Sequence, residues 1–315
     1  MTTPTLTGIH HVTAITADAQ RNVDFYAGVL GLRLVKRTVN FDDPTSYHLY
    51  YGDGLGRPGT ILTFFAWPGA YRGRVGPPQV GATALAVPAG SLGYWRQRLA
   101  AANVTVEEAG ERFGEPAIAF DAPDFMRLEL VAAAAAGPGE PWDRSPVPAE
   151  HQVRGVRSVA LLEEGYERTA DLLTRVMGFR KAAEDGNRFR YEVAAGGPGA
   201  TVDVLCVPGQ RHGSTGVGAV HHVAWRTPDD AQQKAWLAAV AAANLNVSPV
   251  MDRTYFHSIY FREPGGVLFE IATDPPGFTA DEPAAALGEM LMLPPWVEKH
   301  RGQIEAHLEG LTLPR

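Results

Sequence analysis

Two histidine pairs and one glutamate are the residues of this 315-residue chain whose types and positions best suit chemistry. The pairs are His10-His11 and His221-His222, each in a short apolar run, and Glu270 lies in a later run. Neighbouring residues of a strand point to opposite faces of the sheet, so only one histidine of each pair can face a given site. Two histidines and a carboxylate from three strands can bind a mononuclear metal ion and leave coordination positions open. The pattern therefore predicts an open metal site.

Internal repeats indicate which elements must position these residues. Residues 8–15 (GIHHVTAI) resemble residues 155–162 (GVRSVALL), which lie 147 positions later. Residues 118–132 resemble residues 259–273, which lie 141 positions later. The chain therefore reads as a duplication.

Each half divides again into two similar units. The units begin with alternating strands at Gly8, Gly81, Gly155 and Gly218. An amphipathic helix follows each strand, at about 19–30, 91–102, 166–177 and 230–243, and glycines such as Gly31 and Gly178 end two of these helices. Two or three further strands complete each unit. The sequence thus predicts an α+β fold of four βαβββ units in two duplicated halves. The halves are residues 1–150 and 151–315, the units are about 8–70, 81–133, 155–208 and 218–274, and a C-terminal tail has a helix near 297–308.

The repeat also shows that the histidines are unusual. The residues that match the second histidine are Ala84 in unit two and Ser158 in unit three. The strand itself therefore does not require histidine. This favours a functional role over that of ordinary polar residues on a half-exposed sheet.

Four motifs carry a resemblance to a known family. They are GIHHVT (8–13), YHLYYGD (47–53), GAVHHVAW (218–225) and DRTYFHSIYFREPGGVLFEIATD (252–274). Over nearly its whole length the chain resembles the vicinal-oxygen-chelate superfamily, and in particular ring-cleaving dioxygenases of the hydroquinone type. The resemblance implies cupped mixed sheets, a small aromatic substrate, O₂ as co-substrate, and Fe(II) held by His11, His222 and Glu270. The donor types alone would also suit Mn(II) or Zn(II).

The same resemblance implies five supporting residues around the metal and the substrate, namely His10, Thr13, His221, Arg253 and Tyr260. The chemistry agrees for two of them. The Tyr260 phenol can exchange a proton with a bound phenolate, and the Arg253 cation can stabilise an oxyanion. The alternative for each is packing or a surface ion pair. His48, His212 and His257 are further pocket candidates.

The position of the histidines predicts how the units combine. In the resembling catechol-cleaving enzymes the first histidine comes from the start of unit three, where this chain has Ser158. If the triad forms, units one and four must share one cup, and units two and three form a second cup. Glu129 matches Glu270 in the repeat, and we expect it to bind no metal.

Two other functions fit the same fold. A glyoxalase-like isomerase would usually need a second glutamate as fourth ligand, and the last strand of unit one (ILTFF, 61–65) has no carboxylate. A non-catalytic small-molecule-binding protein would lack the triad.

Composition excludes several classes of partner. The chain has 35 acidic and 28 basic residues and a net charge of −7, which argues against nucleic acid. No apolar run approaches the roughly 20 residues that span a membrane. A single cysteine, Cys206, and an N-terminus without a signal-like pattern lead us to expect a cytoplasmic protein. The C-terminal helix and the resemblance are compatible with a homo-oligomer.

Overall fold

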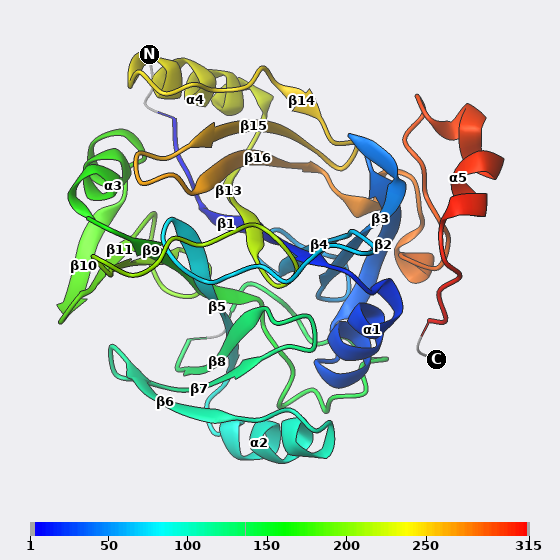
Figure 1. Ribbon diagram of the computed structural model, residues 1–315, viewed down its shortest axis with the longest axis horizontal. Helices are drawn as coiled ribbons and strands as arrows, with labels where there is room; N and C mark the ends of the chain where they lie inside the picture. Colours follow the sequence, from blue (N-terminus) through cyan, green and yellow to red (C-terminus); the bar gives the residue numbers. More distant parts are fainter. Residues whose placement is uncertain (1–3, 136, 314–315) are drawn as a thin grey trace.

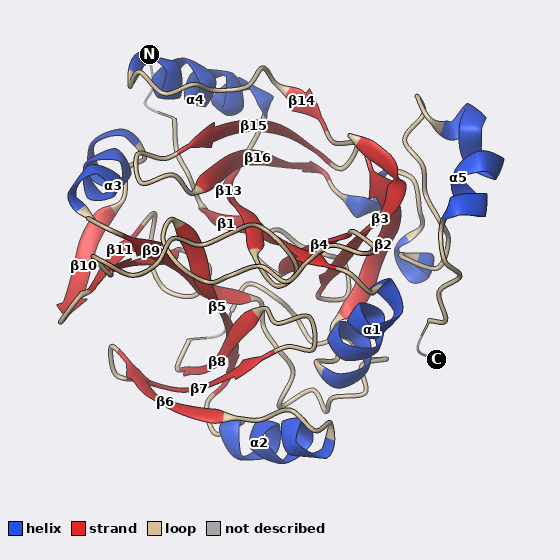
Figure 2. Ribbon diagram, viewed as in Figure 1, coloured by secondary structure: helices blue, strands red, loops and turns tan. Residues whose placement is uncertain are grey.

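Two eight-stranded mixed sheets form the body of the computed structural model, which describes residues 4–135 and 137–313 (Figures 1 and 2). Strand order in the first sheet is β14 (Met251–Asp252), β15 (Phe256–Arg262), β16 (Leu268–Pro276), β13 (Val220–Thr227), β1 (Gly8–Thr16), β4 (Ile61–Ala66), β3 (Asp43–Gly52) and β2 (Arg33–Asn40). Strand order in the second sheet is β10 (Arg180–Asp185), β11 (Arg188–Glu192), β12 (Thr201–Cys206), β9 (Val156–Glu163), β5 (Gln79–Pro88), β8 (Arg127–Ala133), β7 (Glu115–Asp121) and β6 (Glu107–Arg112).

The chain order of these elements confirms the predicted α+β fold of four βαβββ units. The first sheet joins units four and one through the antiparallel pair β1–β13. The second sheet joins units three and two through the antiparallel pair β5–β9. The predicted sharing of one cup by units one and four is therefore confirmed. We call the first sheet cup one and the second sheet cup two.

One helix follows the first strand of each unit and lies outside the sheets (Figure 1). The helices are α1 (Ala19–Val23), α2 (Leu92–Ala101), α3 (Glu167–Asp171) and α4 (Asp230–Ala242). α1 and α3 continue as wider π-helical turns over Asp24–Val29 and Leu172–Val176. Shortly after each wide turn Gly31 or Gly178 takes a positive φ of 71° or 76°, which favours glycine and ends the helix as predicted.

Side-chain caps and buried aromatic residues explain why the helices pack where they do. The Asp18 carboxylate accepts a hydrogen bond from the backbone N–H of Arg21, and Asp229 does the same for Gln232 at the start of α4. The indole rings of Trp95 in α2 and Trp236 in α4 are fully buried in the core. These contacts hold α1, α2 and α4 against the outer side of the sheets.

The C-terminal tail runs along the β2–β3 side of cup one, where α5 (Arg301–His307) lies near β3 (Figure 1). A 3₁₀ turn over Glu298–His300 precedes α5, so the predicted helix near 297–308 is present but shorter. The buried Lys36 ammonium binds the carboxylates of Asp281 and Glu282 and ties β2 to the tail. None of the helices within 4–135 and 137–313 is long and apolar enough to cross a membrane.

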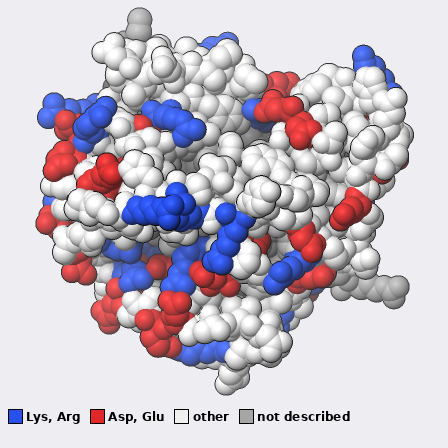
Figure 3. Space-filling view, viewed as in Figure 1, with Lys and Arg blue, Asp and Glu red and all other residues white. Residues whose placement is uncertain are grey.

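Acidic and basic side chains are interspersed on the face shown in Figure 3. Such mixing of both signs agrees with the modest net charge of −7.

Strand register corrects one equivalence drawn from the repeat. In cup one His11 lies opposite Ala224, and in cup two Ser158 occupies the position of His11 and lies opposite Ala84. Ala84 therefore matches Ala224, and the prediction that it matches the second histidine was wrong. Ala82 stands at that position. The strand-opening glycines of units two and four do not occupy equivalent register positions, so alignment on them misplaced the histidine.

Candidate metal centre

Three neighbouring strands bring the predicted ligands together. His11 comes from β1, His222 from β13 and Glu270 from β16, and all three side chains are buried. The Nε2 atoms of the two histidines are 3.2 Å apart. The Oε2 atom of Glu270 lies 2.9 Å from Nε2 of His222 and 3.3 Å from Nε2 of His11. One face of the sheet thus presents three ligand atoms at a single point.

This donor set fits a metal ion. Ligand atoms bound about 2.1 Å from one ion, at right angles to each other, lie about 3.0 Å apart. The buried Oε2 of Glu270 accepts no well-directed hydrogen bond from the described residues, although both Nε2 atoms lie close to it. Burial lowers the pKa of His222 despite the opposing charge of Glu270, which favours the neutral imidazole that binds metals. A cation would satisfy an otherwise uncompensated carboxylate.

The doubled histidines have a structural explanation. Nδ1 of His10 lies 2.9 Å from Nδ1 of His11, and Nδ1 of His221 lies 2.8 Å from Nδ1 of His222. If Nε2 of each second histidine faces an ion, its Nδ1 carries the hydrogen and donates it to the first histidine. Burial lowers the pKa of His10 well below its usual range and that of His221 to about 3, so both remain neutral acceptors. The first histidine of each pair therefore orients the second.

His10 and His221 nevertheless occupy different places. His10 packs against Phe256 with ring centroids 5.0 Å apart and does not line the cavity above the triad. His221 does line the cavity, edge-on to Phe65 and Trp67.

A cavity of about 350 Å³ opens above the triad. Six of its lining residues are phenylalanine, tyrosine or tryptophan, and four are histidine. The lining residues are His11, Asn40, Phe41, Asp42, His48, Tyr50, Phe65, Trp67, His221, His222, Arg253, Phe256, Tyr260 and Leu268. A cavity of this size and character suits a small aromatic ligand.

Tyr260 and Arg253 form one polar group on the wall of this cavity. Tyr260 pairs directly with Glu270 in the β15–β16 register, so both side chains share a face. Nε of Arg253 donates to the Tyr260 hydroxyl at 3.1 Å, and Asp42 holds the same guanidinium at 3.3–3.4 Å. Burial and the charge of Glu270 raise the pKa of Tyr260, against the charge of Arg253 and its hydrogen bond, which lower it. Tyr260 is therefore a neutral phenol with a proton to donate.

Thr13 lies beneath the cavity, at the end of a chain of hydroxyl and imidazole groups. The Tyr50 hydroxyl lies 2.9 Å from Nδ1 of His48, and Nε2 of His48 lies 2.6 Å from the Thr63 hydroxyl. The Thr63 and Thr13 hydroxyls are 3.0 Å apart. In the His48 tautomer with its hydrogen on Nε2, Tyr50 donates to Nδ1, Nε2–H donates to Thr63, and Thr63 donates to Thr13.

His48 thus belongs to the cavity, whereas the other two pocket candidates do not. His212 pairs with Glu164, and His257 pairs with Asp230. The signal that separates His48 is its place in β3, next to the strand that carries Thr63.

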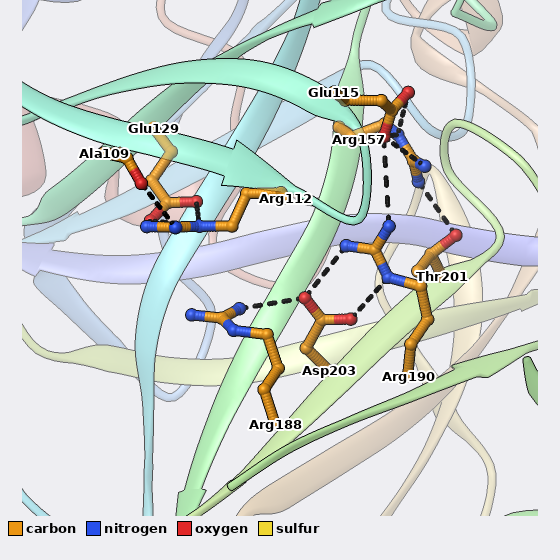
Figure 4. Close-up of polar contacts among 9 residues, drawn as sticks. All are labelled: Ala109, Arg112, Glu115, Glu129, Arg157, Arg188, Arg190, Thr201 and Asp203. Atoms are coloured by element: carbon orange, nitrogen blue, oxygen red, sulfur yellow. Dashed lines mark hydrogen bonds and ion pairs between the residues drawn. The ribbon is translucent and has the colours of Figure 1, made fainter. Parts of the chain in front are cut away.

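Cup two has a different interior (Figure 4). The Arg112 guanidinium contacts both carboxylate oxygens of Glu129, with its closest N–O distance at 2.7 Å. Arg188 and Arg190 both bind the Asp203 carboxylate, at 2.7–3.0 Å. These ion pairs supply the counter-charges that the carboxylates of cup two need.

Comparison with known proteins defines the family. The model of the Glyoxalase/Bleomycin resistance protein/Dioxygenase superfamily matches residues 8–130 and 155–271, which is well over half of the chain. The chain therefore belongs to this superfamily.

Individual relatives point to one group within it. MhqO of Bacillus subtilis, provisionally named a ring-cleaving dioxygenase, is 48% identical over 96% of this chain and 95% of its own length. The chlorohydroquinone/hydroquinone 1,2-dioxygenase of Sphingobium indicum is 37% identical over 92% of each chain. A crystal structure from Bacillus subtilis, provisionally named a dioxygenase, superposes with a TM-score of 0.94 and 46% identity over 99% of both chains. The chain thus groups with the ring-cleaving dioxygenases of the superfamily.

Glyoxalase I from Zea mays shares the fold alone. It superposes with a TM-score of 0.65 at 15% identity, over 85% of this chain and 92% of its own.

Proposed function

We propose that this protein is an Fe(II)-dependent, extradiol-type dioxygenase that opens the ring of a hydroquinone-like or related dihydroxylated aromatic. The observation that carries the proposal is a buried His–His–Glu set below an aromatic cavity of about 350 Å³. Similarity to a chlorohydroquinone/hydroquinone 1,2-dioxygenase supports the substrate class. Two histidines and one carboxylate with open coordination positions are typical of non-haem Fe(II) oxygenases, which supports the choice of iron. In the same proposal His11, His222 and Glu270 are the ligands, and the enzyme acts in the cytoplasm.

Bound Fe(II) would supply open coordination positions and an electron relay between ring and O₂. The protein residues supply the rest. Phe65 and Trp67 are stacked with an interplanar angle of 3° and form an apolar wall for the ring. The Tyr260 hydroxyl, which accepts from Arg253, directs its own proton toward a substrate oxygen. The Arg253 cation stabilises negative charge on the ring oxygens.

Four further assignments complete this proposal. His10 and His221 hold the imidazole rings of the two ligand histidines through Nδ1. Thr13 is the last hydroxyl of the chain that starts at Tyr50. Asp42, an exposed carboxylate that also lines the cavity, anchors the Arg253 guanidinium.

The register argues against the isomerase alternative. Thr13 pairs with Thr63 in unit one as Ala224 pairs with Glu270 in unit four. Thr63 therefore occupies the position where a second glutamate would complete a four-ligand site. Its hydroxyl is instead engaged by His48.

Oxygen uptake tests the proposed function. The protein is purified without oxygen, loaded with Fe(II) and given hydroquinone, 2-chlorohydroquinone or catechol. We expect uptake with a hydroquinone, loss of uptake in Glu270→Ala and Glu270→Gln, and retention in Glu129→Gln, which makes the same change at the matching position of cup two. Absence of uptake on all three rings in the iron-loaded protein would contradict the proposal. A wild-type protein that shows no uptake but still binds one of the three aromatic compounds would instead indicate a non-catalytic binding protein.

A further inference from the structure

Ser258 gives the two oxygens of Glu270 different surroundings. It lies on β15, two residues before Tyr260, and its side chain is fully buried. Its hydroxyl donates a short hydrogen bond to Oε1 of Glu270. The other oxygen, Oε2, faces the two histidines at 2.9 Å and 3.3 Å. One carboxylate oxygen is therefore engaged by the protein, and only the other is directed at the triad.

Cup two contains the same carboxylate without this hydroxyl. Glu129 matches Glu270, and Ala117 stands at the position of Ser258, because it pairs with Val131 as Ser258 pairs with Ala272. There the cation, Arg112, contacts both oxygens of Glu129 from Nε at 3.2 Å each, and Nη2 adds a contact of 2.7 Å (Figure 4). Without a hydroxyl donor, both oxygens of the carboxylate turn to the cation.

We propose that Ser258 is a positioning residue that restricts Glu270 to one oxygen toward the bound ion. The physical basis is the charge-assisted hydrogen bond between the fully buried Ser258 and Glu270, which competes with the ion for Oε1. A second carboxylate oxygen would occupy a coordination position, and Ser258 keeps that position for substrate or O₂. This inference rests on the proposed metal site and adds the residue that controls its number of open positions.

Turnover alone does not separate this role from a simpler one. Ser258 also lies two residues before Tyr260 on the same face of β15, so its loss would disturb a second group of the cavity. A purely structural serine would satisfy Oε1 and leave the coordination of the ion unchanged. The distinguishing quantity is therefore the number of Glu270 oxygens bound to the ion.

The experiment compares wild type, Ser258→Ala and Ser258→Thr. Each protein is stripped of metal, its folding is checked by circular dichroism, and it is then titrated with Co(II). Visible absorption of bound Co(II) weakens as its coordination number rises, and crystal structures of the loaded proteins give the Glu270 contacts. Because the position that matches Ser258 in cup two is already alanine, the control is Ser158→Ala, the same change at a buried strand serine of cup two. If Ser258→Ala does not fold, Ser258→Cys replaces it, because a thiol is a weaker donor of similar size.

We expect Ser258→Ala to bind Co(II) through both Glu270 oxygens, with weaker visible absorption and about tenfold slower oxygen uptake of its iron form. Ser258→Thr restores the wild-type spectrum, and Ser158→Ala does not change it. One-oxygen binding in Ser258→Ala would overturn the inference and leave the proposed function standing. A wild-type protein that binds neither Co(II) nor Fe(II) would overturn the proposed function itself.

Discussion

Cups one and two are built from equivalent strands, yet in the part of the chain that the structure describes cup one alone brings together histidines and a carboxylate that could bind a metal ion. In cup two the positions that match His11, His222 and Glu270 carry Ser158, Ala82 and Glu129, in that order. The carboxylate is thus common to both cups, and the histidines are not. Within the described residues, the candidate metal-binding group is the one in cup one.

The arginines show why this difference matters. Arg112 and Arg253 lie 141 positions apart and occupy matching places in units two and four. Arg112 binds Glu129, whereas Arg253 binds Tyr260 and Asp42 and leaves Glu270 to the histidines. A buried carboxylate needs a compensating positive charge. Cup two supplies this charge from Arg112, and in our proposal cup one leaves this role to a bound metal ion.

A third buried carboxylate is compensated in another way. Glu163, at the end of β9, lies beside Glu263 in the β15–β16 turn, and both are buried. Burial and the neighbouring Glu263 raise the pKa of Glu163 to about 8. Glu163 is neutralised by a proton, Glu129 by an arginine, and Glu270 by the proposed metal ion.

The largest effect is expected from removal of a histidine ligand. His222→Ala should bind no Fe(II) and show background oxygen uptake, because one ligand of three is lost and Glu270 stays uncompensated. Metal analysis after anaerobic loading, together with uptake, measures this. Ser158→Ala, which changes the cup-two position that matches the other histidine, His11, should retain a full complement of iron. Equal iron in both variants would place the ion elsewhere.

Loss of the Tyr260 hydroxyl should affect chemistry more than binding. Tyr260→Phe removes a positioned proton donor, and we expect kcat to fall about 100-fold with little change in KM. Stopped-flow or oxygen-electrode kinetics on a hydroquinone would show the split. A large rise in KM with unchanged kcat would assign Tyr260 to binding alone.

The matching arginines should differ in what they stabilise. Arg112→Ala leaves Glu129 without its counter-ion and should cost about 2 kcal/mol of unfolding free energy, reduced from larger values because the pair is partly exposed. Arg253→Ala should cost less stability and more activity. Urea unfolding of the two variants, side by side with uptake assays, makes the comparison. Equal stability losses would show that the two positions have the same role.

Glu163→Gln should have the smallest effect, and one that depends on pH. The pKa of Glu163 is raised from 4.5 to about 8 in the folded protein. Its contribution to the free energy of unfolding is therefore fully present below about pH 4.5 and is lost as the pH rises through 8. The neutral amide avoids this loss. We expect Glu163→Gln to be more stable than wild type at pH 9 by at least about 1 kcal/mol, or about 2 °C in Tm. The difference should vanish near pH 4.5, and a difference independent of pH would contradict this explanation.

The sequence alone predicted the four units, the shared cup and the gathering of His11, His222 and Glu270. Alternation with period two identifies which residues share a strand face, and the repeat makes unusual residues visible. The sequence could not show that the His10 ring lies behind the His11 ring, because each face of this strand carries one histidine.

Other features depend on contacts between distant strands. The equivalence of Ala82 with the second histidine required the register across β5 and β9, which includes irregular pairs. Ser258 looked like any polar strand residue, because nothing local indicates that its hydroxyl meets Glu270 twelve positions later. The pairing of Arg112 with Glu129 spans a turn and two strands in the same way.

A crystal structure of the protein loaded with Fe(II) under anaerobic conditions, with anomalous data at the iron edge, would examine both cups at once. We predict one anomalous peak per chain, between Nε2 of His11, Nε2 of His222 and Oε2 of Glu270, and none beside Glu129. No peak in cup one, or a peak of equal height in cup two, would contradict the distinction between the cups.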